Sequence, residues 1–165
     1  MMRIGHGYDI HAFNHDAPEA PLFLGGILID APYSLKAHSD GDVIIHAICD
    51  ALLGAAGMGD IGSFFPDTDP AHTNQSSHDF LTAICTKLAD NQYHINNIDV
   101  SVVTEKPKLN PFIASMREQL AKLTNITTGQ INIKATTSEK LGFIGRKEGM
   151  AAYSVALIQH QANQA

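Results

Sequence analysis

The segment at 2–12 constrains the fold most, because its alternate positions differ in character. In a strand, successive side chains point to opposite sides, so a two-residue repeat separates two faces. One face then carries apolar side chains, and the other carries Gly5, Gly7, Asp9 and His11. This pattern predicts an amino-terminal strand with two glycines and two metal-ligating residue types on one side.

Further strand and helix patterns follow along the chain. Short apolar or alternating runs between turn residues predict strands at 22–29, 98–105, 131–136 and 150–158. Apolar residues at helical spacing predict helices at 42–56, from 76 or 77 to about 91, and at 110–123. This order predicts one α+β domain over 1–165, with the helices packed on one face of a mixed or antiparallel sheet.

Local signals refine three of these elements. Asp40 is placed to cap the helix at 42–56, and the Gly25-Gly26 pair predicts a bulge or tight bend within the strand at 22–29. Asn110 is expected to cap the helix at 110–123, with a proline in its first turn. The stretch 57–70 has turn chemistry throughout.

The composition predicts a cytoplasmic enzyme or binding domain. The apolar and charged fractions, 44% and 17%, are those of an ordinary folded protein. No apolar run approaches the roughly 20 residues that a membrane-spanning helix needs, and the amino terminus shows no signal-peptide pattern. Cys49 and Cys85 fall in predicted helices and lack C-x-x-C spacing, which indicates two buried, reduced thiols.

Charge is divided unevenly along the chain, whose net charge is -6. Residues 1–103 carry three basic and thirteen acidic side chains, whereas 104–149 carry eight basic and four acidic ones. The division is compatible with a solvated surface, and also with a metal-binding half folded against a phosphate-binding half. No dense basic stripe with interleaved aromatic residues is present, so nucleic acid is not expected as a partner.

Three residues are candidate ligands of a metal ion. Asp9 and His11 are two apart on the predicted strand, so their side chains project to the same side. His46 lies one turn into the predicted helix at 42–56. A solvated strand face and a structural histidine are the plainer alternatives. If the three side chains meet, two imidazoles and one carboxylate leave zinc with an open fourth position, as a catalytic site requires.

Phosphate-binding candidates lie in the second half of the chain. The hydroxyl run Thr136–Ser138 follows a predicted strand, where free backbone amides can bind an anion, although a plain serine/threonine turn is the alternative. Glu139 comes next and suits a magnesium or manganese ion placed between it and a phosphate. Lys108 projects from a proline-stiffened loop. Asp60 and the loop at 65–69 offer three carboxylates to a sugar diol, or form a solvated turn.

Four motifs together identify a family resemblance. They are Gly-His-Gly-Tyr-Asp-Ile-His at 5–11, Ala-His-Ser-Asp-Gly-Asp at 37–42, Phe-Pro-Asp-Thr-Asp at 65–69 and Lys-Leu-Gly-Phe-Ile-Gly-Arg at 140–146. With these motifs the chain resembles the 2-C-methyl-D-erythritol 2,4-cyclodiphosphate synthase family of the non-mevalonate isoprenoid pathway. The resemblance implies a homotrimer with active sites between subunits. It also implies cyclisation of 4-diphosphocytidyl-2-C-methyl-D-erythritol 2-phosphate with release of CMP.

The resemblance also implies roles for individual positions. It assigns zinc to Asp9, His11 and His46, and a magnesium or manganese ion, shared with the substrate phosphates, to Glu139. His38 and Thr137 become donors that stabilise the transition state. The remaining substrate contacts fall beside the phosphates, in the erythritol loop, in the cytidine pocket and near the subunit interface; they are Ser39, Asp60, Ile61, Gly62, Phe65, Pro66, Asp67, Thr68, Asp69, Thr104, Glu105, Lys106, Pro107, Lys108, Leu109, Asn110, Thr136, Ser138, Phe143 and Arg146.

Two other functions use the same residue types. A zinc-dependent hydrolase of nucleotide diphosphates would employ the same metal ligands but needs a base to activate water. A non-catalytic sensor of a nucleotide or an isoprenoid diphosphate would bind without releasing CMP. Uptake of oxygen from water separates the hydrolase from the cyclase, since cyclisation takes up none.

Overall fold

The computed structural model describes residues 1–66 and 76–161. Its strands are β1 (Met2–Ala12), β2 (Leu22–Leu24), β3 (Ile27–Ile29), β4 (Tyr93–Val103), β5 (Ile131–Thr136) and β6 (Gly149–His160). Its α-helices are α1 (Val43–Ala56), α2 (Ile61–Phe64), α3 (Ser77–Asp90), α4 (Ile113–Thr124) and α5 (Gly142–Gly145). Two 3-10 turns, η2 (Asn110–Phe112) and η3 (Thr128–Gln130), precede α4 and β5. Within these ranges, no helix is long and apolar enough to cross a membrane.

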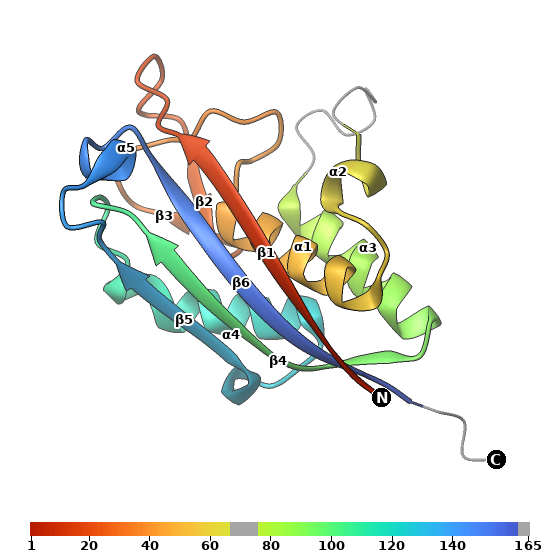
Figure 1. Ribbon diagram of the computed structural model, residues 1–165. Helices are drawn as coiled ribbons and strands as arrows, with labels where there is room; N and C mark the ends of the chain where they lie inside the picture. Colours follow the sequence, from red (N-terminus) through yellow and green to blue (C-terminus); the bar gives the residue numbers. More distant parts are fainter. Residues whose placement is uncertain (67–75, 162–165) are drawn as a thin grey trace.

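Four strands form the main sheet in the order β1-β6-β4-β5. β6 runs antiparallel to both β1 and β4, whereas β4 and β5 are parallel, so the sheet is mixed as predicted. The longer helices α1, α3 and α4 lie together on one face of it (Figure 1). The predicted α+β architecture is therefore confirmed. One consequence matters for function: β1, β4 and β5 all end at the same end of the sheet.

Helix α1 packs unusually close to β1, and the glycines of β1 make this possible. A Cβ atom at Gly5 would lie 1.9 Å from the carbonyl oxygen of Ala51, and one at Gly7 would lie 1.9 Å from that of Ala47. Side chains there would collide with helix backbone, so the glycine face of β1 is the covered one. Apolar residues of α1 fill the space between the sheet and α3.

The opposite face of β1 and β6 exposes apolar and aromatic side chains in the single chain. Ile4 is 71% exposed and Tyr153 is 42% exposed, and Tyr8, Ile10 and Val155 are also exposed. The rings of Tyr8 and Tyr153 lie 4.9 Å apart, centroid to centroid. A contiguous apolar surface of this kind on a folded chain indicates an interaction surface.

Three local predictions are wrong or incomplete in the first half of the chain. The segment 22–29 is a β2–β3 hairpin rather than one strand, because Gly25 and Gly26 adopt φ angles of 59° and 79°, which turn the chain back on itself. Helix α1 is capped by Asp42, not by Asp40. The stretch 57–66 contains the short helix α2 in addition to turns.

The second half also differs at its boundaries. Strand β4 begins at Tyr93, five residues before the predicted start, because its first part pairs with the end of β6. Asn110 does not cap a helix; it starts the 3-10 turn η2, and no side chain caps α4. The predicted thiols occupy helices as expected, with Cys49 buried and Cys85 partly buried.

Candidate active site

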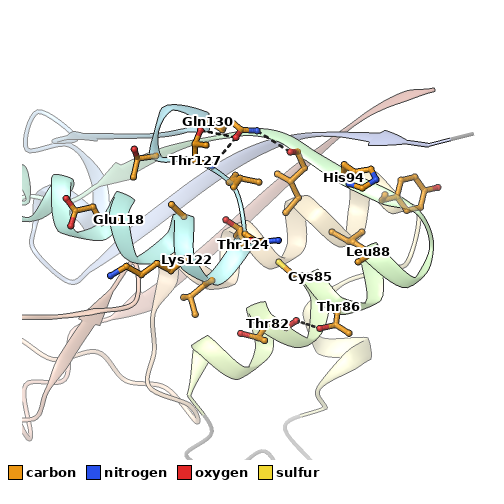
Figure 2. Close-up of a pocket in the computed structure, with 18 residues that line it drawn as sticks. Thr82, Cys85, Thr86, Leu88, His94, Glu118, Lys122, Thr124, Thr127 and Gln130 are labelled. Atoms are coloured by element: carbon orange, nitrogen blue, oxygen red, sulfur yellow. Dashed lines mark hydrogen bonds between the residues drawn. The ribbon is translucent and has the colours of Figure 1, made fainter.

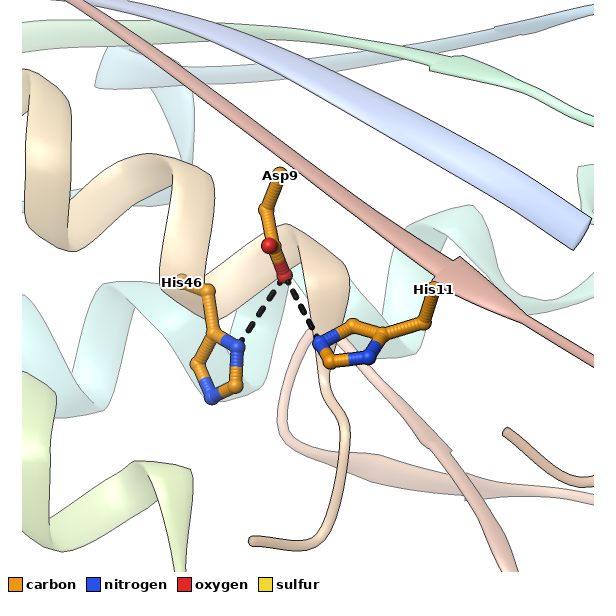
Figure 3. A group of neighbouring side chains, drawn as sticks. All are labelled: Asp9, His11 and His46. Carbon is orange, nitrogen blue, oxygen red and sulfur yellow. Dashed lines mark hydrogen bonds and ion pairs between the residues drawn. The ribbon is translucent and has the colours of Figure 1, made fainter. Parts of the chain in front are cut away.

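Asp9, His11 and His46 meet at the contact between β1 and α1 (Figure 3). Asp9 Oδ2 lies 3.0 Å from His46 Nδ1 and 3.2 Å from His11 Nε2. The three candidate ligand atoms all lie within 4.8 Å of one another. The predicted meeting of these side chains is confirmed, while their role as zinc ligands stays a prediction.

The charges of the three groups depend on one another. Burial raises the pKa of Asp9, but the neighbouring imidazoles of His11 and His46 outweigh burial and hold this pKa well below its usual range. Burial lowers the pKa of His11, but the Asp9 carboxylate outweighs it and the net pKa is raised. The site therefore favours a carboxylate facing positive charge, which either protons or a divalent cation can supply.

One imidazole is already oriented as a metal ligand. His11 Nδ1 lies 2.8 Å from the carbonyl oxygen of Lys36, which can only accept, so Nδ1 carries the proton. His11 Nε2 is buried and has no partner with hydrogen-bonding geometry among the described residues. A buried lone pair directed at a carboxylate fits a bound cation, and the donor set of two imidazoles and a carboxylate suits zinc.

The loop between β3 and α1 carries the two residues predicted beside the reacting phosphates. Ser39 Oγ lies 3.3 Å from His46 Nε2, so this hydroxyl adjoins the metal cluster. His38 precedes it and is exposed to solvent. The exposure of His38 is compatible with the predicted contact to a substrate, which stays a prediction.

Helix α2 presents the first part of the predicted erythritol loop. Asp60 caps it by accepting hydrogen bonds from the backbone N–H and the hydroxyl of Ser63, at 2.8 and 2.7 Å, and these bonds lower the pKa of Asp60. The backbone N–H of Ile61 donates to Asp50 of α1 at 2.8 Å. Gly62 is exposed. The loop is thus fastened to the helix that carries His46.

The rest of that loop is only partly described. The ring of Phe65 packs on Phe80 of α3, with centroids 4.6 Å apart, and Pro66 is exposed. The predicted contacts Asp67, Thr68 and Asp69 lie outside the described residues. Phe65 therefore contributes to packing whether or not it also contacts a substrate.

The predicted cytidine and phosphate loops lie side by side where β4 and β5 end. Because these strands are parallel, the segment 104–110 and the segment 136–138 leave the sheet together. The backbone N–H of Thr104 donates to the carbonyl oxygen of Thr136 at 2.9 Å. Lys106, Lys108 and Asn110 are exposed, whereas Thr104, Pro107 and Leu109 are buried. The lysines are accessible to a ligand, and the buried residues shape the loop.

Glu105 organises the turn after β5. Its Oε1 accepts hydrogen bonds from the backbone N–H groups of Ser138 and Lys140 and from the Ser138 hydroxyl, each at 3.2 Å. The bond from Lys140 contributes most to lowering the pKa of Glu105. Glu139 and Lys140 adopt φ angles of 53° and 64°, and Thr137 donates to Glu139 at 3.0 Å. The bonds of Glu105 hold the turn that carries Thr137 and Glu139, while its predicted place in the cytidine pocket stays a prediction.

Helix α5 and the residue that follows it carry the two predicted contacts near the subunit interface. Phe143 and Arg146 are both exposed. Arg146 Nε donates to Glu148 at 2.7 Å, so its charge is already paired within the chain.

A single chain does not bring all of these groups into one place. The Asp9–His11–His46 cluster lies at the β1 edge of the sheet, whereas the loops at 104–110 and 136–140 follow β4 and β5, on the other side of β6. Three strand spacings separate β1 from β5, which is about 14 Å. Both groups are at the same end of the sheet, because β1, β4 and β5 all end there (Figure 1).

The described residues also form a groove of about 1040 Å³, at the other end of the sheet (Figure 2). It lies between α3, α4 and the start of β4, and its lining includes Cys85, His94, Lys122 and Gln130. None of the predicted site residues lines it. This groove is therefore separate from the site predicted from the sequence.

Sequence reasoning missed two residues beside the cluster. Asp42 is fully buried and accepts hydrogen bonds from the backbone N–H groups of Gly25, Gly26, Ile44 and Ile45, which joins the β2–β3 turn to the start of α1. Ser77 Oγ lies 3.0 Å from His46 Nε2. Asp42 could have been found from the sequence, because an aspartate directly before a helix is a capping signal. For Ser77, nothing in the neighbouring sequence indicates that His46 is its partner.

Comparison with known proteins identifies the family of this chain. The family model described as the YgbB family matches residues 2–159. The chain belongs to the YgbB family. A 2-C-methyl-D-erythritol 2,4-cyclodiphosphate synthase from Francisella tularensis subsp. novicida is 52% identical over 156 residues, covering 94% of this chain and 97% of the relative. The synthase of that name from Thermosynechococcus vestitus is 50% identical, covering 96% of each.

Solved structures show the same fold in this family. IspF from Plasmodium falciparum, in a CDP complex, has a TM-score of 0.85 and 35% identity, covering 98% of this chain and 97% of that one. The bifunctional IspDF from Campylobacter jejuni has a TM-score of 0.92 and 43% identity, and this chain covers 43% of its length. The resemblance read from the four sequence motifs is therefore confirmed.

Proposed function

We propose that this member of the YgbB family is a 2-C-methyl-D-erythritol 2,4-cyclodiphosphate synthase. It converts 4-diphosphocytidyl-2-C-methyl-D-erythritol 2-phosphate to the cyclic diphosphate and releases CMP. The observation that carries the proposal is the Asp9–His11–His46 cluster, formed in a chain that is about half identical to synthases of that name over nearly its full length.

The reaction is an internal phosphoryl transfer. An oxygen of the 2-phosphate forms a bond to the β-phosphorus of the diphosphate, and the bond from that phosphorus to the CMP oxygen breaks. No water is consumed, and the ionised 2-phosphate needs no base. The obstacle is repulsion between anions: two unit charges 4 Å apart repel by about 1 kcal/mol in water but by about 4 kcal/mol at an effective dielectric constant of 20.

The chain offers two places for cations against this repulsion. Asp9, His11 and His46 fit zinc, and Glu139 fits magnesium or manganese together with the substrate phosphates. When bound, such ions act as Lewis acids that polarise the phosphates and neutralise charge on the departing CMP.

The protein's own groups then orient the substrate. His38 of one subunit and Thr137 of its neighbour then act as donors to the oxygens of the pentacoordinate transition state, with Ser39 beside His38. The 104–110 loop and the 136–138 turn hold the cytidine end, and the loop that begins at Asp60 holds the erythritol end. Holding both ends of one flexible molecule can supply several kcal/mol of the barrier.

The assembly that we propose is a homotrimer with its active sites between subunits. Two observations support it: the exposed apolar face of β1 and β6, and the separation of the metal cluster from the nucleotide loops within one chain. In the trimer that we propose, neighbouring copies pack on that face, with the β1 edge of one subunit beside the β4–β5 side of the next. Phe143 and Arg146 then lie near the junction.

Phosphorus NMR tests the function directly. The diphosphocytidyl substrate is incubated with the protein, with and without zinc and magnesium. CMP together with two coupled resonances of a cyclic diphosphate is the expected result. CMP with linear phosphates, and with oxygen taken up from isotopically labelled water, would identify a hydrolase instead. No change under any metal condition would leave a binding protein.

A further inference from the structure

We infer that Ser77 is a positioning residue for His46: its hydroxyl joins the imidazole to Asp40 and keeps Nδ1 of the ring facing Asp9 and the metal. The inference rests on the metal assignment proposed above. It concerns a residue at the first position of α3, 31 positions from His46 in the chain.

The imidazole of His46 has close partners on both ring nitrogens. Nδ1 lies 3.0 Å from Asp9 Oδ2, and Nε2 lies 3.0 Å from Ser77 Oγ. The side chain of His46 is 12% exposed and Ser77 is 0% exposed, so water competes little for these contacts. The ring is thus held between β1 on one side and α3 on the other.

The proton positions follow from the partner of Ser77. The Ser77 hydroxyl donates to Asp40 Oδ1, and the Ser77 backbone N–H donates to Asp40 Oδ2 at 2.8 Å. An ionised carboxylate only accepts, so the serine hydroxyl has given its single hydrogen to Asp40. Its oxygen therefore accepts from His46 Nε2–H. With the proton fixed on Nε2, the lone pair of Nδ1 is available to a metal.

Metal-ligating histidines elsewhere donate the second ring N–H to a carboxylate, a backbone carbonyl or a water. Here the acceptor is a serine hydroxyl that is itself bound to the Asp40 carboxylate. Ser39 is the other hydroxyl near Nε2, at 3.3 Å. Its Oγ also accepts from the backbone N–H of Gly41 at 3.3 Å, and no carboxylate contact supports it among the described residues. Ser77 is the better placed of the two.

Ser76 supplies a matched control. It is the N-cap of α3 and accepts from the backbone N–H of His78 at 3.2 Å. Replacing it removes a serine hydroxyl from the same helix start without removing the hydroxyl bound to His46. Ser77→Thr keeps a hydroxyl at the position, and Asp40→Asn keeps Ser77 but removes the carboxylate behind it.

The experiment measures zinc affinity of the full chain by competition with a chromophoric chelator at fixed pH. We expect Ser77→Ala to weaken zinc binding about 10- to 100-fold, the range found when such supporting partners are removed. Ser77→Thr should recover most of the affinity, and Ser76→Ala should leave it unchanged. The double variant Ser77→Ala/Asp40→Asn should bind zinc no more weakly than the weaker single variant, because both changes break the same chain of bonds.

Proton NMR of the zinc-loaded protein adds a readout of the ring itself. The wild-type chain should show a slowly exchanging Nε2–H resonance of His46, and Ser77→Ala should lose it. Wild-type affinity in Ser77→Ala, or an equal loss in Ser76→Ala, overturns the inference. If Ser77→Ala does not fold, wild-type affinity in Asp40→Asn overturns it instead. A wild-type chain that binds no zinc refutes the metal assignment itself, which is a separate failure.

Discussion

Gly7→Ala tests whether the close contact between β1 and α1 builds the metal cluster. The new Cβ atom would lie 1.9 Å from the carbonyl oxygen of Ala47 and 2.7 Å from the backbone nitrogen of Ala51. Real Cβ atoms essentially never approach below 3.0 Å, so the strand and the helix must separate by about 1.1 Å. Both opposing atoms belong to backbone, so no rotamer change can relieve the collision.

The displacement acts on stability and on the cluster together. Overpacking of this kind costs about 1–3 kcal/mol, and we expect the upper end because the helix is held on its other side by core packing. For a chain of this size, 3 kcal/mol lowers Tm by about 6–12 °C. Asp9 lies two residues after Gly7, and His46 precedes Ala47. The 3.0 Å distance between Asp9 Oδ2 and His46 Nδ1 should therefore increase by a similar amount, so zinc affinity falls as well.

Thermal unfolding and zinc titration of the variant measure both effects. Gly54→Ala is the matched control on the same helix, because the nearest atom to its Cβ would be the carbonyl oxygen of His6, 3.9 Å away. An alanine in an open helix position should stabilise the protein by about 0.5–1 kcal/mol. If Gly7→Ala melted and bound zinc like the wild type, the close contact would not be what forms the cluster.

Four further predictions follow from other contacts. His46→Ala should abolish zinc binding and turnover while leaving the oligomer intact, and the exposed His15→Ala should change neither; zinc retained by His46→Ala would contradict the ligand assignment. In metal-free protein, the raised pKa of His11 contributes stability that is complete below about pH 6.5 and is lost as pH rises through that raised pKa. Zinc affinity should increase over the same range, because zinc requires the neutral ring. Thermal melts and zinc titrations across about pH 6–9 test both effects, and two flat profiles would refute the prediction. Asp42→Ala leaves four backbone N–H groups without their acceptor and should cost about 2–4 kcal/mol in denaturant unfolding; a loss below 1 kcal/mol would mean that water replaces the carboxylate. Glu105→Ala frees the turn after β5 and should raise KM in steady-state assays without reducing zinc content, so an unchanged KM would deny it an organising role.

The parts of the fold that the sequence predicted well are those with local causes. The two-residue repeat at 2–12 identified β1 with its observed bounds, and helical spacing with a serine start identified α3. The four motifs were sufficient for the family, since they depend on residue type and spacing alone. At Gly25 and Gly26 the predicted bend goes further than expected, because the positive φ angles of both glycines turn the segment into a hairpin.

For the candidate site, the sequence predicted which residues take part but not the contacts between them. Asp9 and His11 share a strand face for a local reason, whereas their contact with His46 joins residues 37 and 35 positions apart in the chain. Likewise, Asp40 was expected to cap α1, but Asp42 is the residue that does so. The Asp40 carboxylate instead accepts a hydrogen bond from the backbone N–H of Ser77 at the start of α3. Local sequence cannot distinguish between two helix starts that folding brings together.

By itself the sequence determined which residues share a face of β1, where the main helices run, and the family to which the chain belongs. Tertiary structure alone decided that the face with Gly5 and Gly7 is the covered one, because only glycine admits the α1 backbone so closely, and this leaves the apolar face exposed. It also placed the Asp9–His11–His46 cluster and the loops that follow β4 and β5 on opposite sides of β6 in one sheet. Periodicity specifies the two sides of an element, but the partner that covers one of them is set by packing between segments far apart in the chain.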